Sequence, residues 1–520
     1  MVPAVITAWC LHSLSLPGYV VQVDSVFGPH SPSPAWGFTA PLQLVSYLVG
    51  GAAAGRLWIA AALYLCGFGP MVLFRRQHWI VQLFAGGLSS LNPWVYGRLV
   101  EGQWGVAAAL GMIFLWLGAW EALQRRPGWP RAVCCAGLGG AAAVFDQHSL
   151  GLLVVLAGAS LVWHRSWWHR PNMAWSGASF LLVGVLLLYG LVPFFVGHGN
   201  DSYHAIAQFS QTDLIAFRAA ASSTYGLWVN LAGLFGFWPE RLGRMPLLNR
   251  GAVWWPLTTA ILLVAAVAGA WLRRDRAWLL ATGVLGLALA GSTATGPGLA
   301  ATFWLMQRVP LLAAFREPEK WDALWLIALV VLGAEALAML IVKVSTGRPL
   351  ASALSAVAVV CLALALLLPD GVSAIRELPA TVAPVRYPAS WLDAAAYLRA
   401  QVPARDRVVV LPWELYEPLP FTGDRLTANP APVVFPGYLI SPSDAQLPGA
   451  ANPAGPDDLA RVALHPVDGS CALESTLRRL GVHWAIVEPA PGGQADAREL
   501  LSCGFDVGYG HLPGLVVLRR

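Results

Sequence analysis

Long stretches without a charged residue constrain this chain more than any other feature. Several of them run for roughly 17 to 22 residues, long enough for a helix to cross a bilayer of about 30 Å. Of the 520 residues, 57% are hydrophobic and 12% are charged, whereas about 25% is typical of soluble domains. The sequence therefore predicts a polytopic α-helical membrane protein, with enough chain left over for a second domain.

The apolar stretches and the arginines together predict a topology. We expect eleven transmembrane helices, near residues 3–20, 57–74, 79–92, 104–124, 132–146, 148–163, 175–196, 253–272, 277–292, 322–342 and 350–369. Every second loop between the predicted helices is rich in basic residues, and the positive-inside rule places such loops in the cytoplasm. The N-terminus is then cytoplasmic and the C-terminus extracytoplasmic, in a multi-pass plasma (inner) membrane protein. The apolar stretch 40–54 is expected to lie along the outer interface as a helix.

The chain after the last predicted span has a different composition. Pro, Asp and Glu become common from residue 370 onward. Helical spacing over 390–401 and 471–481 alternates with the strand-like segments RVVVLP, VHWAIVEP and GLVVLRR. We therefore expect a transmembrane domain over residues 1–370 and a small extracytoplasmic α/β domain over residues 371–520.

Two of the seven cysteines, Cys471 and Cys503, lie in this tail. Disulfides persist in oxidising compartments outside the cytoplasm. An extracytoplasmic tail therefore favours a bridge between Cys471 and Cys503, and the alternative is two buried free thiols.

The strong preference for arginine over lysine reflects the base composition of the genome and does not indicate a chemical function. Of the 33 basic residues, all but Lys320 and Lys343 are arginine, and Ala and Gly are abundant. This bias is typical of GC-rich genomes such as those of actinobacteria. The net charge of +5 comes mainly from arginines in short loops, so it reflects membrane topology and not nucleic-acid binding.

Motifs for common cofactors are missing from the sequence. It contains no HExxH, no paired CxxC, no Walker loop, and no GxGxxG that follows a strand. A secondary transporter is not favoured either, because we find no inverted repeat and no regular string of charges within the spans. Polar motifs beside an apolar bundle remain, and they suit a reaction between a lipid-linked substrate and a polar acceptor at the outer leaflet.

Four polar groups fall on the same predicted face of the membrane. They are Asp24, residues 92–101, residues 146–148 and residues 316–320. Charges are costly in hydrocarbon, so charges gathered at one face mark a candidate site.

The residues in and around these groups resemble the GT-C superfamily, polytopic glycosyltransferases that use polyprenyl-phosphate-linked sugars. The resemblance rests on the acidic first external loop (VDSVFGPH), on LNPWVYGRLVEGQWG at 91–105, and on FREPEKW at 315–321. The tail, with YPASWLDAAAYL and VVVLPWELYEP, resembles actinobacterial members of the arabinofuranosyltransferase type. The first loop holds a single Asp where several branches hold an acidic pair, so a divalent cation is left open.

The resemblance implies that Asp24 is a general base. An inverting transferase must take a proton from the acceptor hydroxyl as that hydroxyl attacks the anomeric carbon, and a positioned carboxylate typically contributes about 10²–10⁴-fold. The alternative is that Asp24 caps a helix or a turn before Pro29.

Fixed cations are the second requirement, because the leaving lipid phosphate gains negative charge. Arg316 and Lys320 fit this role, and they would share a face if the segment is helical. Glu317 and Glu319 would hold these cations or bind sugar hydroxyls. The alternative is a salt-bridged cluster at the end of a span, where basic side chains often snorkel.

Two further groups are expected near this site. Arg98 and Glu101 are candidates for substrate binding, or they form an i, i+3 ion pair that stabilises a turn. Asp146 is a second candidate catalytic carboxylate, with His148 touching the lipid phosphate; the alternative is an external hairpin turn.

Together these features predict a membrane glycosyltransferase. The expected partners are a polyprenyl-phosphate sugar, a glycan, glycolipid or protein acceptor, and membrane lipids. The alternative is a non-catalytic component of envelope polysaccharide assembly or export. The residues do not choose between arabinose and mannose. The transferase hypothesis requires the loop with Asp24 and the basic segment at 316–320 to converge on one pocket open to the outer leaflet.

Overall fold

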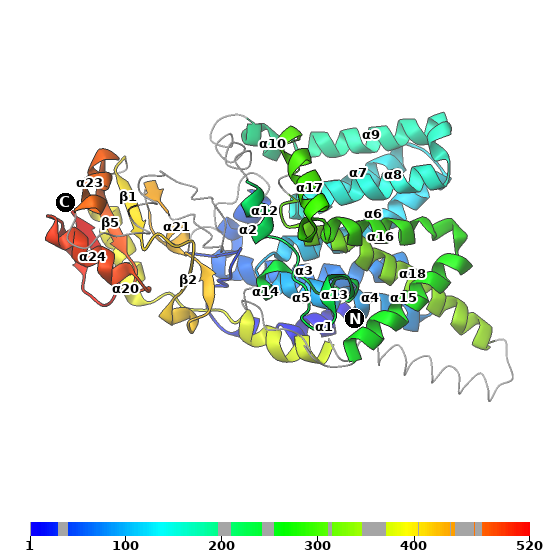
Figure 1. Cartoon of the computed structure of the whole chain (residues 1–520), viewed down its shortest axis with the longest axis horizontal. Coiled ribbons are helices and arrows are strands. Elements are labelled where there is room, and N and C mark those ends of the chain that lie inside the picture. The colour runs from blue at the N-terminus through cyan, green and yellow to red at the C-terminus, as the bar shows by residue number, and fades with distance from the viewer. Residues whose placement is uncertain are drawn as a thin grey trace. The chain divides into compact units, whose positions relative to one another are not determined.

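The structure is a computed structural model of the whole chain, mostly helical with a small sheet near the C-terminus (Figure 1). It describes residues 2–29, 40–195, 210–241, 254–309, 312, 315–345, 371–403, 405–436, 438–441, 462 and 471–520. The chain divides into two compact units. The helical unit contains Met1–His12, Trp36–Thr39 and Trp58–Thr381; the α/β unit contains Ser13–Ala35, Ala40–Leu57 and Val382–Arg520.

Apolar helices account for most of the helical unit. The structure describes five segments long and apolar enough to cross a membrane: Gly51–Leu73 (α3), Trp104–Arg125 (α6), Arg170–Gly190, Trp255–Leu272 and Pro318–Lys343. The last three contain α9 (Arg170–Leu186), most of α15 (Trp254–Leu272) and most of α18 (Asp322–Ser345). Shorter apolar helices are α4 (Trp79–Ser90), α7 (Trp129–Phe145), α8 (Ser149–Trp163) and α16 (Trp278–Ala290). Figure 1 shows α6, α7 and α9 side by side.

Eleven crossings are therefore not confirmed. The predicted span at 3–20 is a nine-residue helix, α1 (Val2–Cys10), followed by a 3₁₀ turn at His12–Ser15, because Pro17 and Gly18 interrupt the apolar run. The stretch 40–54 contains α2 (Ala40–Val49) and the start of α3. The span predicted at 350–369 lies outside the described residues.

Two glycines allow α3 and α6 to approach closely. A Cβ atom added at Gly69 would lie within 2.1 Å of the carbonyl oxygen of Gly111, and one added at Gly111 would lie within 2.2 Å of the carbonyl oxygen of Leu65. Small residues at helix contacts are typical of membrane bundles, where backbone packing replaces the hydrophobic effect. This contact brings the segments before α6 into the interior of the unit.

Charged side chains in the helical unit gather in two layers. One layer surrounds Arg98 and Lys320 and is described below. In the other, Arg276 pairs with Glu121 of α6 and with Glu335 of α18. Along α6, Trp104 beside the first layer and Glu121 in the second are about 25 Å apart at ~1.5 Å per residue. That spacing is close to the thickness of a hydrocarbon core, as expected if the charges mark two membrane faces.

The α/β unit is built on a mixed five-stranded sheet with strand order β4-β1-β5-β7-β6. Its strands are β1 (Arg407–Leu411), β4 (Tyr438–Ile440), β5 (Val482–Val487), β6 (Asp506–Gly510) and β7 (Val516–Arg519). Strand β1 pairs in parallel with β4 and β5, whereas β7 is antiparallel to β5 and β6. The predicted α/β tail is thus confirmed, and its apolar runs at 407–412, 482–489 and 514–520 contain β1, β5 and β7.

Helices cover both faces of this sheet. Trp391 and Leu398 of α20 (Ala389–Gln401) pack on Val408 and Val410 of β1. On the other face, α23 (Ala472–Arg479) and α24 (Gly493–Ser502) bury their apolar residues against Val409 and Leu411. Alternate residues of β1 therefore serve two separate cores, as the two-residue period of a strand requires.

The first loop of the chain belongs to the core of this α/β unit. Val21 and Val26 are buried in the same cluster as Trp391. Tyr19 pairs with Val385 through two backbone hydrogen bonds of 2.8 Å, and the hydroxyl of Tyr387 donates to the carbonyl of Phe27 at 2.8 Å. The loop that carries Asp24 is therefore held by the tail.

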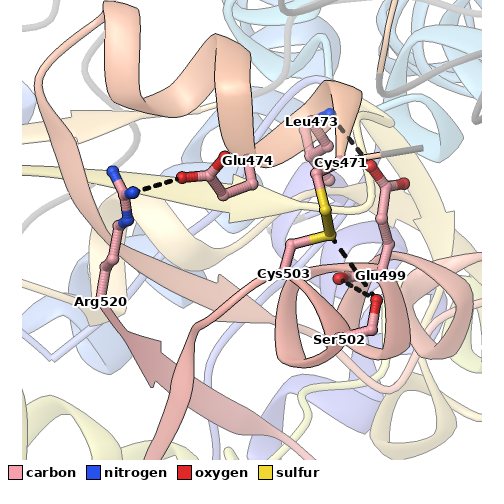
Figure 2. Close-up of a disulfide and its surroundings, with 7 residues drawn as sticks. All are labelled: Cys471, Leu473, Glu474, Glu499, Ser502, Cys503 and Arg520. Carbon is pink, nitrogen blue, oxygen red and sulfur yellow. Dashed lines mark hydrogen bonds and ion pairs between the residues drawn. A yellow bond between two sulfur atoms is a disulfide. The ribbon is translucent and has the colours of Figure 1, made fainter. Parts of the chain in front are cut away.

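A disulfide joins Cys471, just before α23, to Cys503, just after α24 (Figure 2). Beside it, the carboxylate of Glu499 accepts a hydrogen bond from the backbone N–H of Leu473 at 3.0 Å. The bridge therefore ties together the two helices that cover one face of the sheet.

Replacing both bridge cysteines by alanine should lower the free energy of unfolding of the α/β unit. Closure of a loop with a sequence separation of 32 constrains the unfolded chain, and we expect a loss of roughly 3–4 kcal/mol. Pulse proteolysis of the full chain across a urea series, scored by cleavage within residues 405–520, would measure it. Cys134→Ala, at an exposed free cysteine, is the matched control. Equal urea midpoints for both variants would contradict the expectation.

Candidate functional site

A short helix before α6 places the first charged residue of the site. Helix α5 (Pro93–Val100) begins at Asn92, whose side-chain oxygen accepts from the N–H of Val95, and proline suits the first helical position. All eight residues of α5 are buried. The helix therefore carries Arg98 into the interior, where its exposed fraction is 0%.

Arg98 is held on both sides. Its Nη1 donates to Oε1 of Gln103 at 2.6 Å and to Oε2 of Glu317 at 3.2 Å. Its guanidinium lies 3.9 Å from the ring centroid of Phe237, a cation–π contact. With no exposed surface, Arg98 acts in this structure as an internal partner of Glu317.

Glu317 is the centre of the cluster. It accepts from Nε2 of Gln103 at 3.1 Å and lies 3.3 Å from Nζ of Lys320. Burial alone would raise the pKa of this carboxyl, but Lys320, Arg98 and Arg316 hold that pKa below its ordinary value. Glu317 is therefore ionised and shared between two buried cations.

Lys320 continues the cluster to the turn between α7 and α8. Its Nζ lies 3.4 Å from Nδ1 and 3.2 Å from Nε2 of His148, so the ammonium contacts the face of the imidazole ring. Nδ1 of His148 lies 2.6 Å from Oδ1 of Asp146. Burial opposes ionisation of Asp146, yet His148 and Lys320 keep the pKa of its carboxyl below the ordinary value.

Aromatic rings close one side of this chain of contacts. The ring of Phe315 meets His148 edge to face at 5.3 Å and stacks on Trp321 at 4.2 Å. Gly151 of α8 makes room, because a Cβ atom there would lie 2.5 Å from the Phe315 ring. The imidazole orientation is thus fixed by packing as well as by hydrogen bonds.

The structure brings together most of the residues expected at the site. Arg98, Glu317, Lys320, His148 and Asp146 form one continuous series of contacts. Gln103 was not predicted, although it lies inside the segment at 91–105; an uncharged amide gives no charge signal. Glu101 caps the C-terminal end of α5 and is buried.

The basic segment does not have the expected local shape. We predicted that Arg316 and Lys320 share a helix face, but Pro318–Trp321 is a single 3₁₀ turn and Arg316 precedes it. The four-residue spacing therefore does not align them. The half-buried Arg316 guanidinium lies 5.3 Å from the Phe217 ring centroid, while Lys320 meets His148.

Two more buried carboxyls lie in this segment. Glu319 and Asp322 are 1% and 0% exposed, and their side-chain oxygens have no hydrogen-bond partner within the described part of the chain. The backbone oxygen of Glu319 accepts from Nε1 of Trp94 at 2.9 Å, which ties the turn to α5. Among the residues described, no group of three or more His, Cys, Asp or Glu side chains is placed to hold a metal ion.

Asp24 is exposed and belongs to the α/β unit. The hydroxyl of Tyr416 donates to its Oδ1 at 3.2 Å. Tyr416 lies on a two-stranded hairpin of β2 (Tyr416–Pro418) and β3 (Leu426–Ala428), and the N–H of Ala428 donates to the carbonyl of Gln22. The hairpin therefore orients the Asp24 carboxylate, and convergence of Asp24 with residues 316–320 stays a prediction.

The α/β unit also contains a buried carboxyl pair. Nδ2 of Asn429 donates to Glu417 and to Glu488, each at 2.8 Å, and both carboxyls are almost fully buried. Burial raises the pKa of Glu417 to about 7 and, together with the charge of Glu417, raises the pKa of Glu488 well above its ordinary value. The pair therefore holds at least one proton near neutral pH.

Comparisons with known proteins bear on the fold. No family model and no curated protein sequence matches this chain. Among solved structures, the arabinofuranosyltransferase AftD from Mycobacteria matches 100% of this chain with 15% identity and a TM-score of 0.58, over 39% of AftD. A variant of AftD gives 14% identity, a TM-score of 0.60, and coverage of 100% of this chain and 41% of that one. ArnT from Cupriavidus metallidurans in the apo state gives 15% identity and a TM-score of 0.43, covering 99% and 92%.

AftD and ArnT are both GT-C glycosyltransferases. The likeness to AftD shows that this chain shares the fold of AftD. The chain spans about two fifths of the length of AftD.

Removing Arg98 should destabilise the helical unit much more than removing an exposed arginine. Arg98→Met leaves Glu317 with one fewer buried cation, and breaking such a pair costs about 3–5 kcal/mol. Arg98→Met/Glu317→Met should recover part of that loss. Arg125→Met is the control, since its side chain is 68% exposed and its pair with Glu121 contributes about 0.5 kcal/mol or less. Unfolding midpoints in nanodiscs test this, and equal midpoints for Arg98→Met and Arg125→Met would refute it.

Raising the pH should weaken the α/β unit. Above pH ~4.3 the unfolded chain releases protons from Glu417 and Glu488 that the folded pair retains, so stability falls as pH rises toward and beyond the folded pKa values. We expect a loss of about 3 kcal/mol between pH 5 and 8, and a flatter profile for Glu488→Gln. Urea-series pulse proteolysis at each pH would show it, with the exposed Asp506→Asn as control. A wild-type profile that stays flat would exclude proton retention by the pair.

Proposed function

We propose that this chain is a membrane glycosyltransferase that moves a sugar from a polyprenyl-phosphate donor to an extracytoplasmic acceptor, with inversion at the anomeric carbon. The GT-C fold supports a glycosyltransferase. The acceptor class is a cell-envelope glycan, a glycolipid or a protein. An arabinofuranosyl donor is the first to test, because the matched protein AftD is an arabinofuranosyltransferase.

The observation that carries the proposal is the buried cluster around Lys320. Lipid phosphate gains negative charge as the glycosidic bond breaks, and preoriented cations stabilise that charge without reorganisation. Lys320 is fixed by Glu317 and His148, and Arg316 precedes it in the same segment. An ammonium has three hydrogens to donate, and one of them would meet an oxygen of the lipid phosphate in this proposal.

The other members of the cluster set the charge and position of Lys320. Arg98 and Gln103 orient Glu317, and Asp146 orients His148. Three cations, Arg98, Arg316 and Lys320, lie near the ionised Glu317 and would attract a phosphate.

Asp24 is the general base of this proposal. Its carboxylate would take the proton of the acceptor hydroxyl as that hydroxyl attacks the anomeric carbon, and the lipid phosphate would leave from the opposite face. The Tyr416 hydroxyl donates to this carboxylate and fixes its orientation. The tail thereby contributes to catalysis by orienting this loop.

A plasma-membrane location with the α/β unit outside the cytoplasm fits these roles. The bridge between Cys471 and Cys503 is typical of extracytoplasmic domains. Arginines 125, 273 and 276 lie in the charged layer around Glu121 and Glu335, as expected for a cytoplasmic face. The cluster around Lys320 then lies toward the outer leaflet.

Asp24→Asn should lower the transfer rate by about 10²–10⁴-fold, because the amide cannot accept the proton. The assay uses the full chain in nanodiscs with polyprenyl-phosphate arabinose or mannose and membrane-derived acceptors. Tyr416→Phe should reduce the rate less than about tenfold, since the carboxylate loses one orienting hydrogen bond.

Tyr509→Phe is the matched control, at a tyrosine of β6 that packs on Tyr397. Its rate should equal that of the wild type. Full activity in Asp24→Asn would remove Asp24 as the base. No turnover of either donor by the wild type would instead favour a non-catalytic role in envelope polysaccharide assembly or export.

A further inference from the structure

A second feature of the helical unit is a cavity of about 220 Å³ beside α13 (Gly226–Ala232). It is separate from the contacts of Lys320. Its lining combines hydroxyl, amide and aromatic side chains: Ser222, Ser223, Thr224, Tyr225, Asn230, Phe235 and Trp255. None of these described lining residues carries a charge.

A tight turn presents the hydroxyl groups. Oγ of Ser222 accepts from the backbone N–H groups of Thr224 and Tyr225, each at 3.2 Å, and the N–H of Gly226 returns to the carbonyl of Ser222 at 2.9 Å. The Ser222 hydroxyl is therefore engaged by the backbone of the turn, whereas Ser223 and Thr224 are exposed. Their hydroxyls are therefore the ones offered to a ligand.

Aromatic rings form a rigid wall opposite the turn. Trp255 of α15 meets Tyr225 edge to face at 5.1 Å and Phe235 at 5.0 Å. Gly233 allows this packing, because a Cβ atom there would lie 2.7 Å from the Trp255 ring. Asn230 is fixed too, since its Nδ2 donates to the carbonyl of Ala220 at 2.9 Å.

This lining selects a class of ligand by chemistry. A phosphate would find no cation in it, and an acyl chain would cover the Ser223 and Thr224 hydroxyls without bonding to them. A sugar ring matches it, because one ring carries several hydroxyls that both donate and accept, and it also has apolar C–H faces that pack on aromatic rings. The volume lies below the roughly 300–1,000 Å³ of sites for drug-sized ligands, so it suits a single ring.

The cavity and the charged cluster share one segment of chain. Phe235 lines the cavity, and two residues later Phe237 contacts the Arg98 guanidinium. At the last residue of α13, the carbonyl of Ala232 accepts from Nε1 of Trp325 of α18 at 3.0 Å. A ring in the cavity would thus bind to the same segment that packs against the proposed phosphate site.

We propose that this cavity is a neutral sugar-binding subsite that holds one ring of the acceptor glycan. The assignment of that ring to an acceptor rests on the proposed glycosyltransferase function, whereas sugar binding itself does not. Donor phosphate and acceptor sugar are then recognised by separate surfaces, one charged and one uncharged.

Binding is tested with the full chain in nanodiscs by saturation-transfer NMR. The probes are linear arabinofuranosyl and mannopyranosyl pentasaccharides. Ser223→Ala/Thr224→Val removes two exposed hydroxyls and leaves the Ser222 turn intact, so the Kd should rise about 3- to 10-fold. Thr212→Val, at an exposed threonine of α12 (Gln211–Ala216), should bind like the wild type. Wild-type affinity in the double variant, or no binding of either probe by the wild type, overturns the subsite.

Kinetics separate this inference from the proposed function. The double variant should raise the acceptor KM about 3- to 10-fold and leave the donor KM unchanged. Pentasaccharide binding without any donor turnover would refute the transferase and keep the sugar site. Turnover with an unaltered acceptor KM in the double variant would refute the acceptor subsite and keep the transferase.

Discussion

One buried carboxylate, Glu317, allows the helical unit to keep cations away from water. A guanidinium and an ammonium at this depth would each cost several kcal/mol if unpaired. Glu317 meets both Arg98 and Lys320, and Gln103 occupies its second oxygen. The pairing and the hydrogen bond from Trp94 to the backbone of Glu319 join the buried helix α5 to the segment before α18. Such a preorganised group of charges is what phosphate chemistry requires.

Sequence reasoning found the components of this cluster and missed its geometry. Runs of apolar residues identify α6 and α18, and local charge identifies Arg98 and Lys320. Residues Pro318–Trp321 form a 3₁₀ turn that Arg316 precedes, so the two cations do not share a helix face as a helical segment would have required. Gln103 is uncharged, so the distribution of charged residues along the sequence could not identify it. Helix counting was least successful at 3–20, where apolar composition alone cannot show where a helix ends.

Long-range contacts were beyond any local pattern. Asp24 and Tyr416 are 392 residues apart, and nothing near either position predicts their hydrogen bond. The α/β tail was predictable because β1, β5 and β7 are short apolar runs between helical segments. The burial of Val21 and Val26 in the core of this tail was not predictable, because the sequence placed both residues in an external loop. The uncharged cavity beside α13 also gives no signal, because Ser, Thr and Asn are ordinary loop residues.

The first loop is buried in the core formed by the tail, so it cannot fold fully until the tail has been synthesised. The hydrogen bond between Tyr387 and Phe27 joins residues 360 positions apart. At about 5–20 residues per second, the ribosome needs roughly 20–70 s to make the intervening chain. Throughout that interval Val21 and Val26 lack the partners that bury them, because every strand of the five-stranded sheet lies after residue 387. A chaperone that shields this early loop until translation ends would protect the nascent protein from aggregation.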